Sequence, residues 1–199
     1  RIPKSVITPY HATQIHALKI PSLTKKLEGV WGVTRASPDA LTKHKEDLRS
    51  ELTPSHLAKA NLQKGRLLYQ RQCSACHVLY GQGGKLGPDL TGSGRSSLDY
   101  LLENVVDPSG AVSVDYRMTV LTLKDGRALS GMISGQDRNS LTLRMPGSET
   151  VVSKSSIKSR QALPNSIMPA GLFDNLSLEE RRDLIGYLMH PQQVSLPKP

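Results

Sequence analysis

The sequence predicts a mainly α-helical fold with a small antiparallel β insertion, so that the chain is α+β overall. Apolar residues recur at helical spacing over residues 55–76, 96–106 and 177–189. Residues 115–160 instead show apolar side chains alternating with threonines, and Asp125-Gly126 is typical of a tight hairpin turn. The 199 residues suffice for one or two small domains.

These patterns divide the chain into four parts. Residues 1–54 are a basic N-terminal extension or linker, and Thr53-Pro54-Ser55 marks its end. Residues 55–114 and 161–192 form the main helical domain, and residues 115–160 are the inserted β-unit. Residues 193–199 are a C-terminal tail.

Two short helices are expected in the extension, at Leu23–Trp31 and Leu41–Leu52. Three more belong to the main helical domain, at Ser55–Cys76, Ser96–Val106 and Ser177–Met189. The last begins with the capping box Ser177-Leu178-Glu179-Glu180 and ends before Pro191.

The first and last helices of this domain are expected to cross. Gly65 lies four residues before Tyr69, on the same helical face, and a glycine there permits another helix to approach closely. The expected partner is the apolar side of the last helix, which consists of Leu184, Ile185, Tyr187 and Leu188.

Within the β-unit, the pattern predicts four or five short strands that curl into a sandwich or a partial barrel. Ala128–Ile133 is the strand that returns after Asp125-Gly126, and Pro146-Gly147 ends the next one. The strand–Asp-Gly–strand pattern, with Asn139 and Leu141 downstream, faintly resembles Sm-like barrels.

The motif Cys73-Ser74-Ala75-Cys76-His77 is the most informative feature of the sequence about function. C-x-x-C-H is the attachment signature of a c-type haem. Two thiols at this spacing lie on one face of a helical turn and can form thioether bonds to the two vinyl groups of a porphyrin. His77 can then ligate the iron from below. The sequence therefore predicts one covalent haem c, with its iron, and the only two cysteines of the chain hold it.

Three other interpretations of this motif stay open. A thioredoxin-like redox pair needs a βαβ context, which the sequence lacks. A zinc site usually needs a second pair of cysteines or histidines at matching spacing. A structural disulfide between the cysteines would leave His77 without a role.

Met168 is the best candidate for the second axial ligand, because it precedes Pro169 in a loop before the last helix. A thioether favours ferrous iron and raises the reduction potential. The open alternatives are a penta-coordinate iron and a different ligand. The other methionines are expected in strands or at the end of the last helix, and they are Met118, Met132, Met145 and Met189. The other histidines are mostly expected in exposed or terminal segments, and they are His11, His16, His44, His56 and His190.

Two residues after the motif are expected to support the haem. The carbonyl of Pro88, in the turn Gly87-Pro88-Asp89-Leu90, is placed to accept a hydrogen bond from the His77 ring N–H. Arg95 is a candidate to neutralise a haem propionate, and the alternative is an ordinary surface arginine.

The net charge of +9 is unevenly distributed. Residues 1–50 hold nine basic and four acidic residues, residues 115–160 hold eight and four, and the rest holds nine of each. Such a field favours docking to a redox protein with an acidic surface, although solubility alone also explains it. With one aromatic residue, Tyr116, in the β-unit, nucleic-acid binding is not expected. The β-unit is instead a candidate surface for docking or homodimerisation.

No apolar run approaches the roughly 18 residues of a transmembrane segment. The chain begins at Arg1, without a recognisable signal sequence, so we interpret it as a mature protein or a fragment. Covalent haem is normally attached outside the bacterial cytoplasm, so the haem prediction implies a periplasmic or otherwise extracytoplasmic location.

Taken together, these residues resemble class I cytochrome c. The pairs Gly65/Tyr69 and Leu184/Tyr187 are similar to that family's crossing of first and last helices, and the resemblance covers residues 55–112 and 161–190. It implies the proximal turn at Gly87-Pro88, the propionate arginine at Arg95 and the distal loop at Met168-Pro169. The chain departs from it in one respect, since 91 positions separate His77 from Met168.

With the β insertion, the chain resembles the haem-binding C-terminal domain of large Planctomycetes-type proteins that are often described as membrane-bound dehydrogenases. The runs that carry this resemblance are Gly87–Gly92, Leu101–Asn104 and Leu123–Arg127. The expected function is single-electron transfer between redox partners, as a separate protein or as a domain of a larger dehydrogenase, and the chain itself is not expected to be an enzyme. The alternative is a haem sensor or catalytic haem domain with an open or displaceable sixth ligand.

Overall fold

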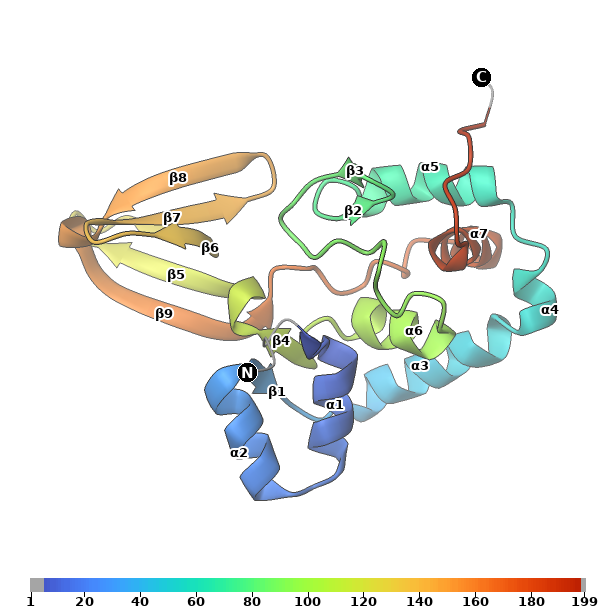
Figure 1. The fold of residues 1–199 in the computed structure, drawn as a ribbon, viewed down its shortest axis with the longest axis horizontal. Helices are drawn as coiled ribbons and strands as arrows, with labels where there is room; N and C mark the ends of the chain where they lie inside the picture. The colour runs from blue at the N-terminus through green and yellow to red at the C-terminus, as the bar shows by residue number, and fades with distance from the viewer. Residues whose placement is uncertain (1–5, 198–199) are drawn as a thin grey trace. The chain divides into compact units, whose positions relative to one another are not determined.

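The structure is a computed structural model that describes residues 6–197, and it separates into two compact units (Figure 1). The first consists of residues 6–36 and 108–169, and the second of residues 37–107 and 170–197. The predicted N-terminal extension, 1–54, therefore contributes to both units. The first five residues of that extension and the last two of the predicted tail lie outside the described residues.

The second unit is built from helices and contains the C-x-x-C-H motif. A short antiparallel pair follows the motif, with Val78–Leu79 (β2) against Gln82–Gly83 (β3). The described helices of this unit are α3 (Asp39–Glu51), α4 (Pro54–Leu57), α5 (Leu62–Gln72), α6 (Leu98–Val106) and α7 (Leu178–Met189).

The long helix predicted at Ser55–Cys76 is wrong in its extent. It is divided into α4 and α5, and α5 ends at Gln72, before the first cysteine of the motif. Asn61 causes the break, because its side chain accepts a hydrogen bond from the Lys64 amide and so begins a new helix. Its own amide donates to the Asp183 carboxylate on α7 over 2.9 Å, which fixes the start of α5 against that helix.

Helices α5 and α7 cross at Gly65, as the sequence predicts. A Cβ added to Gly65 would lie 2.0 Å from the Asp183 carbonyl oxygen and 2.7 Å from Tyr187 Cβ. The Tyr69 and Tyr187 rings pack beside this contact, with centroids 5.7 Å apart. The predicted capping box of α7 is also present, because Ser177 and Glu180 exchange hydrogen bonds.

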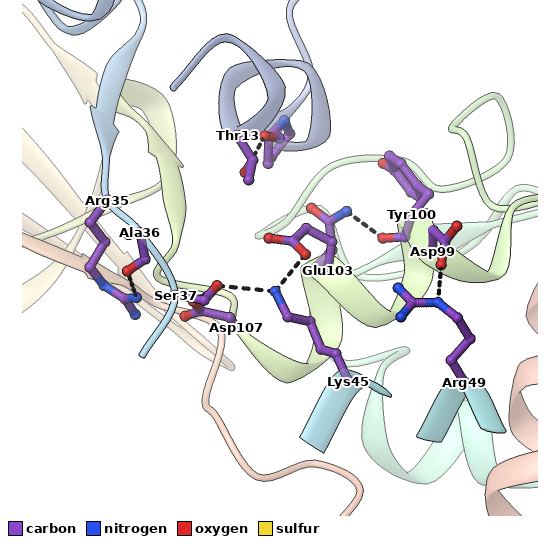
Figure 2. Close-up of polar contacts among 12 residues, drawn as sticks. Thr13, Arg35, Ala36, Ser37, Lys45, Arg49, Asp99, Tyr100, Glu103 and Asp107 are labelled. Carbon is purple, nitrogen blue, oxygen red and sulfur yellow. Dashed lines mark hydrogen bonds and ion pairs between the residues drawn. The ribbon is translucent and has the colours of Figure 1, made fainter. Parts of the chain in front are cut away.

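Helix α3 packs against α6 and encloses a buried charge (Figure 2). Lys45, only 8% exposed, donates to the Glu103 carboxylate over 2.6 Å and to the Ser37 hydroxyl over 3.0 Å. Ser37 in turn donates to the Asp107 carboxylate over 2.8 Å. Because an uncompensated buried charge is strongly destabilising, these bonds tie residues 37–51 to the helical unit.

The first unit has its own small core around Trp31. Its N-terminal part consists of α1 (Pro9–Ala17), α2 (Pro21–Val30) and Gly32–Thr34 (β1), which pairs with Ala111–Ser113 (β4). The Trp31 ring is buried with Ala12, Leu27 and Ala111, and its Nε1 donates to the Ile7 carbonyl over 2.7 Å. Segments about 80 residues apart in the sequence thus form one body.

The remainder of this unit is a five-stranded antiparallel sheet in the order β8-β7-β6-β5-β9. It is a single sheet and not a sandwich. Buried side chains from β5, β7 and β8 form one cluster, although β6 lies between β5 and β7, so the sheet curls around them. Its strands are β5 (Arg117–Leu123), β6 (Ala128–Gln136), β7 (Ser140–Met145), β8 (Ser148–Ser153) and β9 (Ile157–Ser166).

The crossing of α5 and α7 gives a stability prediction. In Gly65→Ala, the new methyl group would overlap the Asp183 carbonyl, so the helices must separate. We expect a loss of about 3 kcal/mol in the free energy of unfolding, measured by urea titration followed by circular dichroism. Gly92→Ala, where nothing lies within 4 Å of the added Cβ, is the control. Equal stability of the two variants would contradict a tight crossing.

Candidate functional site

The C-x-x-C-H motif forms a tight turn directly after α5. The Cys73 amide still donates to the Tyr69 carbonyl over 2.8 Å, as the C-terminal cap of the helix. The Cys73 carbonyl then accepts from the amides of Cys76 and His77, at 3.1 and 2.9 Å. This winding keeps the two thiols and the imidazole within one turn, which is the placement that attachment to a single porphyrin requires.

The backbone of this turn is held from outside as well. The Gly84 and Gly87 amides donate to the Ser74 and Cys76 carbonyls, both over 2.7 Å. The Tyr69 hydroxyl donates to the His77 carbonyl over 2.7 Å. The loop after His77 therefore folds back over the motif and fixes it.

The hydrogen bond from Tyr69 to His77 was not predicted from the sequence, where Tyr69 was expected only at the helix crossing. A tyrosine four residues before the first cysteine, in a chain that is only 4% aromatic, is the signal that points to it.

The imidazole of His77 is oriented on both sides. Its Nδ1 lies 2.9 Å from the Pro88 carbonyl oxygen, so Nδ1–H donates there and the lone pair of Nε2 is left for a ligand. Gly87 lies against the ring, and a Cβ at that position would be 2.5 Å from His77 Cε1. Only glycine leaves the ring this space, so the loop is a cradle for one imidazole orientation. The predicted contact with Pro88 is present, and its role in iron ligation stays a prediction.

The electrostatics of the turn favour neutral groups. Burial lowers the pKa of His77, against the opposing effect of its hydrogen bond to Pro88. Burial, with a smaller contribution from Cys76, raises the pKa of Cys73 to about 12. Burial also raises the pKa of Cys76. A redox-active C-x-x-C pair instead has a lowered thiol pKa, so this environment does not favour the thioredoxin-like interpretation.

The other interpretations of the motif fit less well. Both cysteines are free thiols. Among residues 6–197, no group of three or more His, Cys, Asp or Glu side chains is arranged to hold a metal ion. Cys73, Cys76 and His77 therefore do not converge as the ligands of one zinc ion. The free imidazole nitrogen beside two neutral thiols does fit a haem.

Arg95 is engaged by the protein itself. It is only 7% exposed, and its Nη1 donates to the carbonyls of Leu188, over 2.6 Å, and of His190. Its guanidinium also stacks over the Tyr80 ring, 4.9 Å from the centroid. Arg95 thus caps the C-terminal end of α7, where a cation is favourable. It is not an ordinary surface arginine, and its contact with a propionate stays a prediction.

Met168 belongs to the first unit, whereas His77 belongs to the second. Its amide donates to the Ser166 hydroxyl over 3.1 Å, and the Ser166 amide donates to the Ser109 hydroxyl over the same distance. The chain passes from the first unit to the second at Pro169 and Ala170. The ligation of iron by Met168 therefore stays a prediction.

Part of the chain is similar to a known protein family. Residues 60–119 match the family described as "Cytochrome C oxidase, cbb3-type, subunit III", which is 60 of the 199 residues. No curated protein matches the chain. The matched segment contains Cys73, Cys76, His77, Pro88 and Arg95, and it ends before Met168.

Within residues 6–197, no helix has the length and apolar character needed to traverse a bilayer.

The turn that presents Cys73, Cys76 and His77 lies inside the matched segment. The match supports a c-type cytochrome domain in this chain, and such a domain implies haem c with its iron and suggests electron transfer.

Proposed function

We propose that the chain is a monohaem c-type cytochrome that carries single electrons between redox partners. Cys73 and Cys76 hold the haem covalently, and His77 and Met168 ligate its iron. The observation that carries this proposal is the His77 imidazole, which is held by Pro88 and Gly87 beside two neutral thiols. When bound, the haem supplies a one-electron couple between ferric and ferrous iron.

The protein residues serve to orient and enclose this group. The hydrogen bond from His77 Nδ1 to the Pro88 carbonyl fixes the tautomer and raises the basicity of the other ring nitrogen. The turn held by Tyr69, Gly84 and Gly87 keeps the imidazole in place in both oxidation states. A fixed ligand reduces the reorganisation that accompanies electron transfer.

The same proposal includes the fold family of the helical unit, the location of the protein and the nature of its redox partner. The fold of the helical unit is that of class I cytochrome c, and the chain corresponds to the haem-binding domain type of large Planctomycetes-type proteins. Its location is extracytoplasmic, and its redox partner presents an acidic surface. The proposal is supported by the crossing at Gly65, the contact of Pro88 with His77 and the match over residues 60–119.

A second candidate function is a sensory or catalytic haem with a displaceable sixth ligand. The observation that favours it is the position of Met168, which lies outside the matched segment and on a different unit from His77. An open or displaceable axial position lets the iron bind small molecules.

Absorption spectra of the ferric and ferrous protein distinguish the two functions. The electron-transfer proposal predicts low-spin spectra in both states, a weak sulfur-to-iron charge-transfer band at the red edge of the ferric spectrum, and no immediate change on addition of carbon monoxide. A high-spin ferrous spectrum that shifts at once with carbon monoxide would contradict the proposal and favour the second candidate.

A further inference from the structure

The turn between α1 and α2 exposes bulky aliphatic side chains. Leu18 is 59% exposed, Ile20 43% and Leu23 39%. Single exposed aliphatic residues are normal on protein surfaces. Three of them within six positions concentrate apolar surface in one short segment, and exposed apolar surface of this kind marks interaction sites. We call Leu18, Ile20 and Leu23 the apolar tip. The connection between α1 and α2 lies at the end of the two helices away from β1 and β4 (Figure 1).

The apolar tip is not part of the core of its unit. That core is formed by Ala12, Leu27, Trp31 and Ala111, and Ile7 and Ile15 pack against it. Between Leu18 and Ile20, Lys19 adopts the left-handed conformation, with φ 53°. Lys19 directly follows Leu18, the C-cap of α1, and a left-handed residue at this position is a common way for a helix to end. Lys19 thus ends α1 between two exposed aliphatic residues, Leu18 and Ile20.

Three lysines lie close in the sequence to the apolar tip. Lys19, Lys25 and Lys26 are exposed, and none of them forms an ion pair with the part of the chain that the structure describes. The described residues of the first unit hold twelve Lys and Arg against five Asp and Glu, a balance of +7. Those of the second unit hold eleven against twelve. The positive charge of the protein is therefore concentrated on the unit that carries the apolar tip.

We propose that the α1–α2 turn binds the surface of an anionic phospholipid membrane. Leu18, Ile20 and Leu23 enter the boundary between headgroups and acyl chains, and Lys19, Lys25 and Lys26 contact lipid phosphates. Aliphatic residues flanked by lysines are the composition of interfacial membrane contacts.

A protein partner fits this surface less well. Protein interfaces are enriched in Tyr, Trp and Arg and depleted of Lys, whereas the turn has lysines and no exposed aromatic residue. The connection between α1 and α2 also lies at the end of a helix pair, away from β1 and β4 (Figure 1), which suits contact with a lipid surface. This proposal does not depend on the function of the haem.

Co-sedimentation of the full haem-loaded chain with vesicles tests the proposal. Vesicles of phosphatidylglycerol and phosphatidylcholine should bind the protein, and binding should weaken as salt is added. Vesicles of phosphatidylcholine alone should bind it weakly. Leu18→Asn/Ile20→Asn, which leaves the charge unchanged, should weaken binding to the anionic vesicles by roughly tenfold. Lys25→Glu/Lys26→Glu should weaken it by roughly 30-fold or more.

Matched controls lie on the sheet of the same unit. Val151→Asn removes an aliphatic side chain that is 69% exposed, and Lys124→Glu/Lys158→Glu makes the same change of charge at exposed positions away from the turn. Both should retain most of the binding. Equal losses in the control and the turn variants would show a diffuse charge effect and overturn the proposal. An absence of binding to anionic vesicles would overturn the proposal as well. That result is expected if the turn instead forms a contact between two copies of the chain.

Discussion

The double variant Cys73→Ser/Cys76→Ser is expected to lose all covalently bound haem. Each thioether bond forms when a thiol adds across a vinyl group, and a serine hydroxyl does not undergo this addition under the same conditions. The chain holds only these two cysteines, so no other thiol can replace them. In a host that attaches c-type haem, the wild-type chain should keep its haem stain on a denaturing gel, and the variant should show none.

Ser74→Ala is the matched control for this prediction. Ser74 lies between the cysteines, and its hydroxyl donates only to the Gln70 carbonyl within the described structure. This variant should keep the full haem content of the wild-type chain. Retention of covalent haem by the double cysteine variant would contradict the attachment chemistry outright.

Met168→Ala is expected to lower the reduction potential and to open one axial position of the iron. A methionine sulfur stabilises the ferrous state, and axial ligands set haem potentials over a range of roughly 0.8 V. We expect a decrease on the order of 0.1 V or more in a redox titration. The ferrous variant should also bind carbon monoxide at once, because alanine cannot reach or ligate the iron.

Met145→Ala controls for the removal of a methionine from the same unit. Met145 ends β7 and, like Met168, is partly buried, but its place in a strand indicates packing. This variant should keep the wild-type potential and spectra. If Met168→Ala also left both unchanged, Met168 would not be the ligand, and the sensory or catalytic alternative would gain.

The elements that were predicted well are those with strong local signals. Helix α7 follows from Ser177 and Glu180 at its start and Pro191 after its end, and each of these acts on the backbone nearby. The hairpin between β5 and β6 follows in the same way from Asp125-Gly126. Such signals need no knowledge of the rest of the fold.

The elements that were missed depend on distant contacts. Helix α1 has His11, His16 and Thr13 on a short, weakly amphipathic segment, and it is stabilised by packing with Trp31 and Ala111. The pairing of β1 with β4 joins Gly32 to Ser113 and spans only three residues on each side, which is too short to give a pattern. The sequence shows two separate basic segments, and only the structure places residues 6–36 of the first segment in one unit with residues 115–160.

In the candidate site too, features with local signals were predicted and features that depend on distant contacts were not. The spacing of Cys73, Cys76 and His77 and the turn at Pro88 were sufficient to predict the contact between His77 and Pro88. The hydrogen bonds of Arg95 to the end of α7 were not predictable, because they join residues more than 90 positions apart. The assignment of Met168 to the first unit was not predictable either, because it depends on contacts between distant parts of the chain.

The mass of the wild-type protein, unfolded in acid and freed of unbound pigment, shows whether the haem is joined covalently to Cys73 and Cys76. Addition of both thiols across the vinyl groups loses no atoms. We therefore expect a single species that is heavier than the polypeptide by the full mass of one haem and that absorbs as a haem throughout the separation. A colourless species at the mass of the polypeptide alone would contradict it.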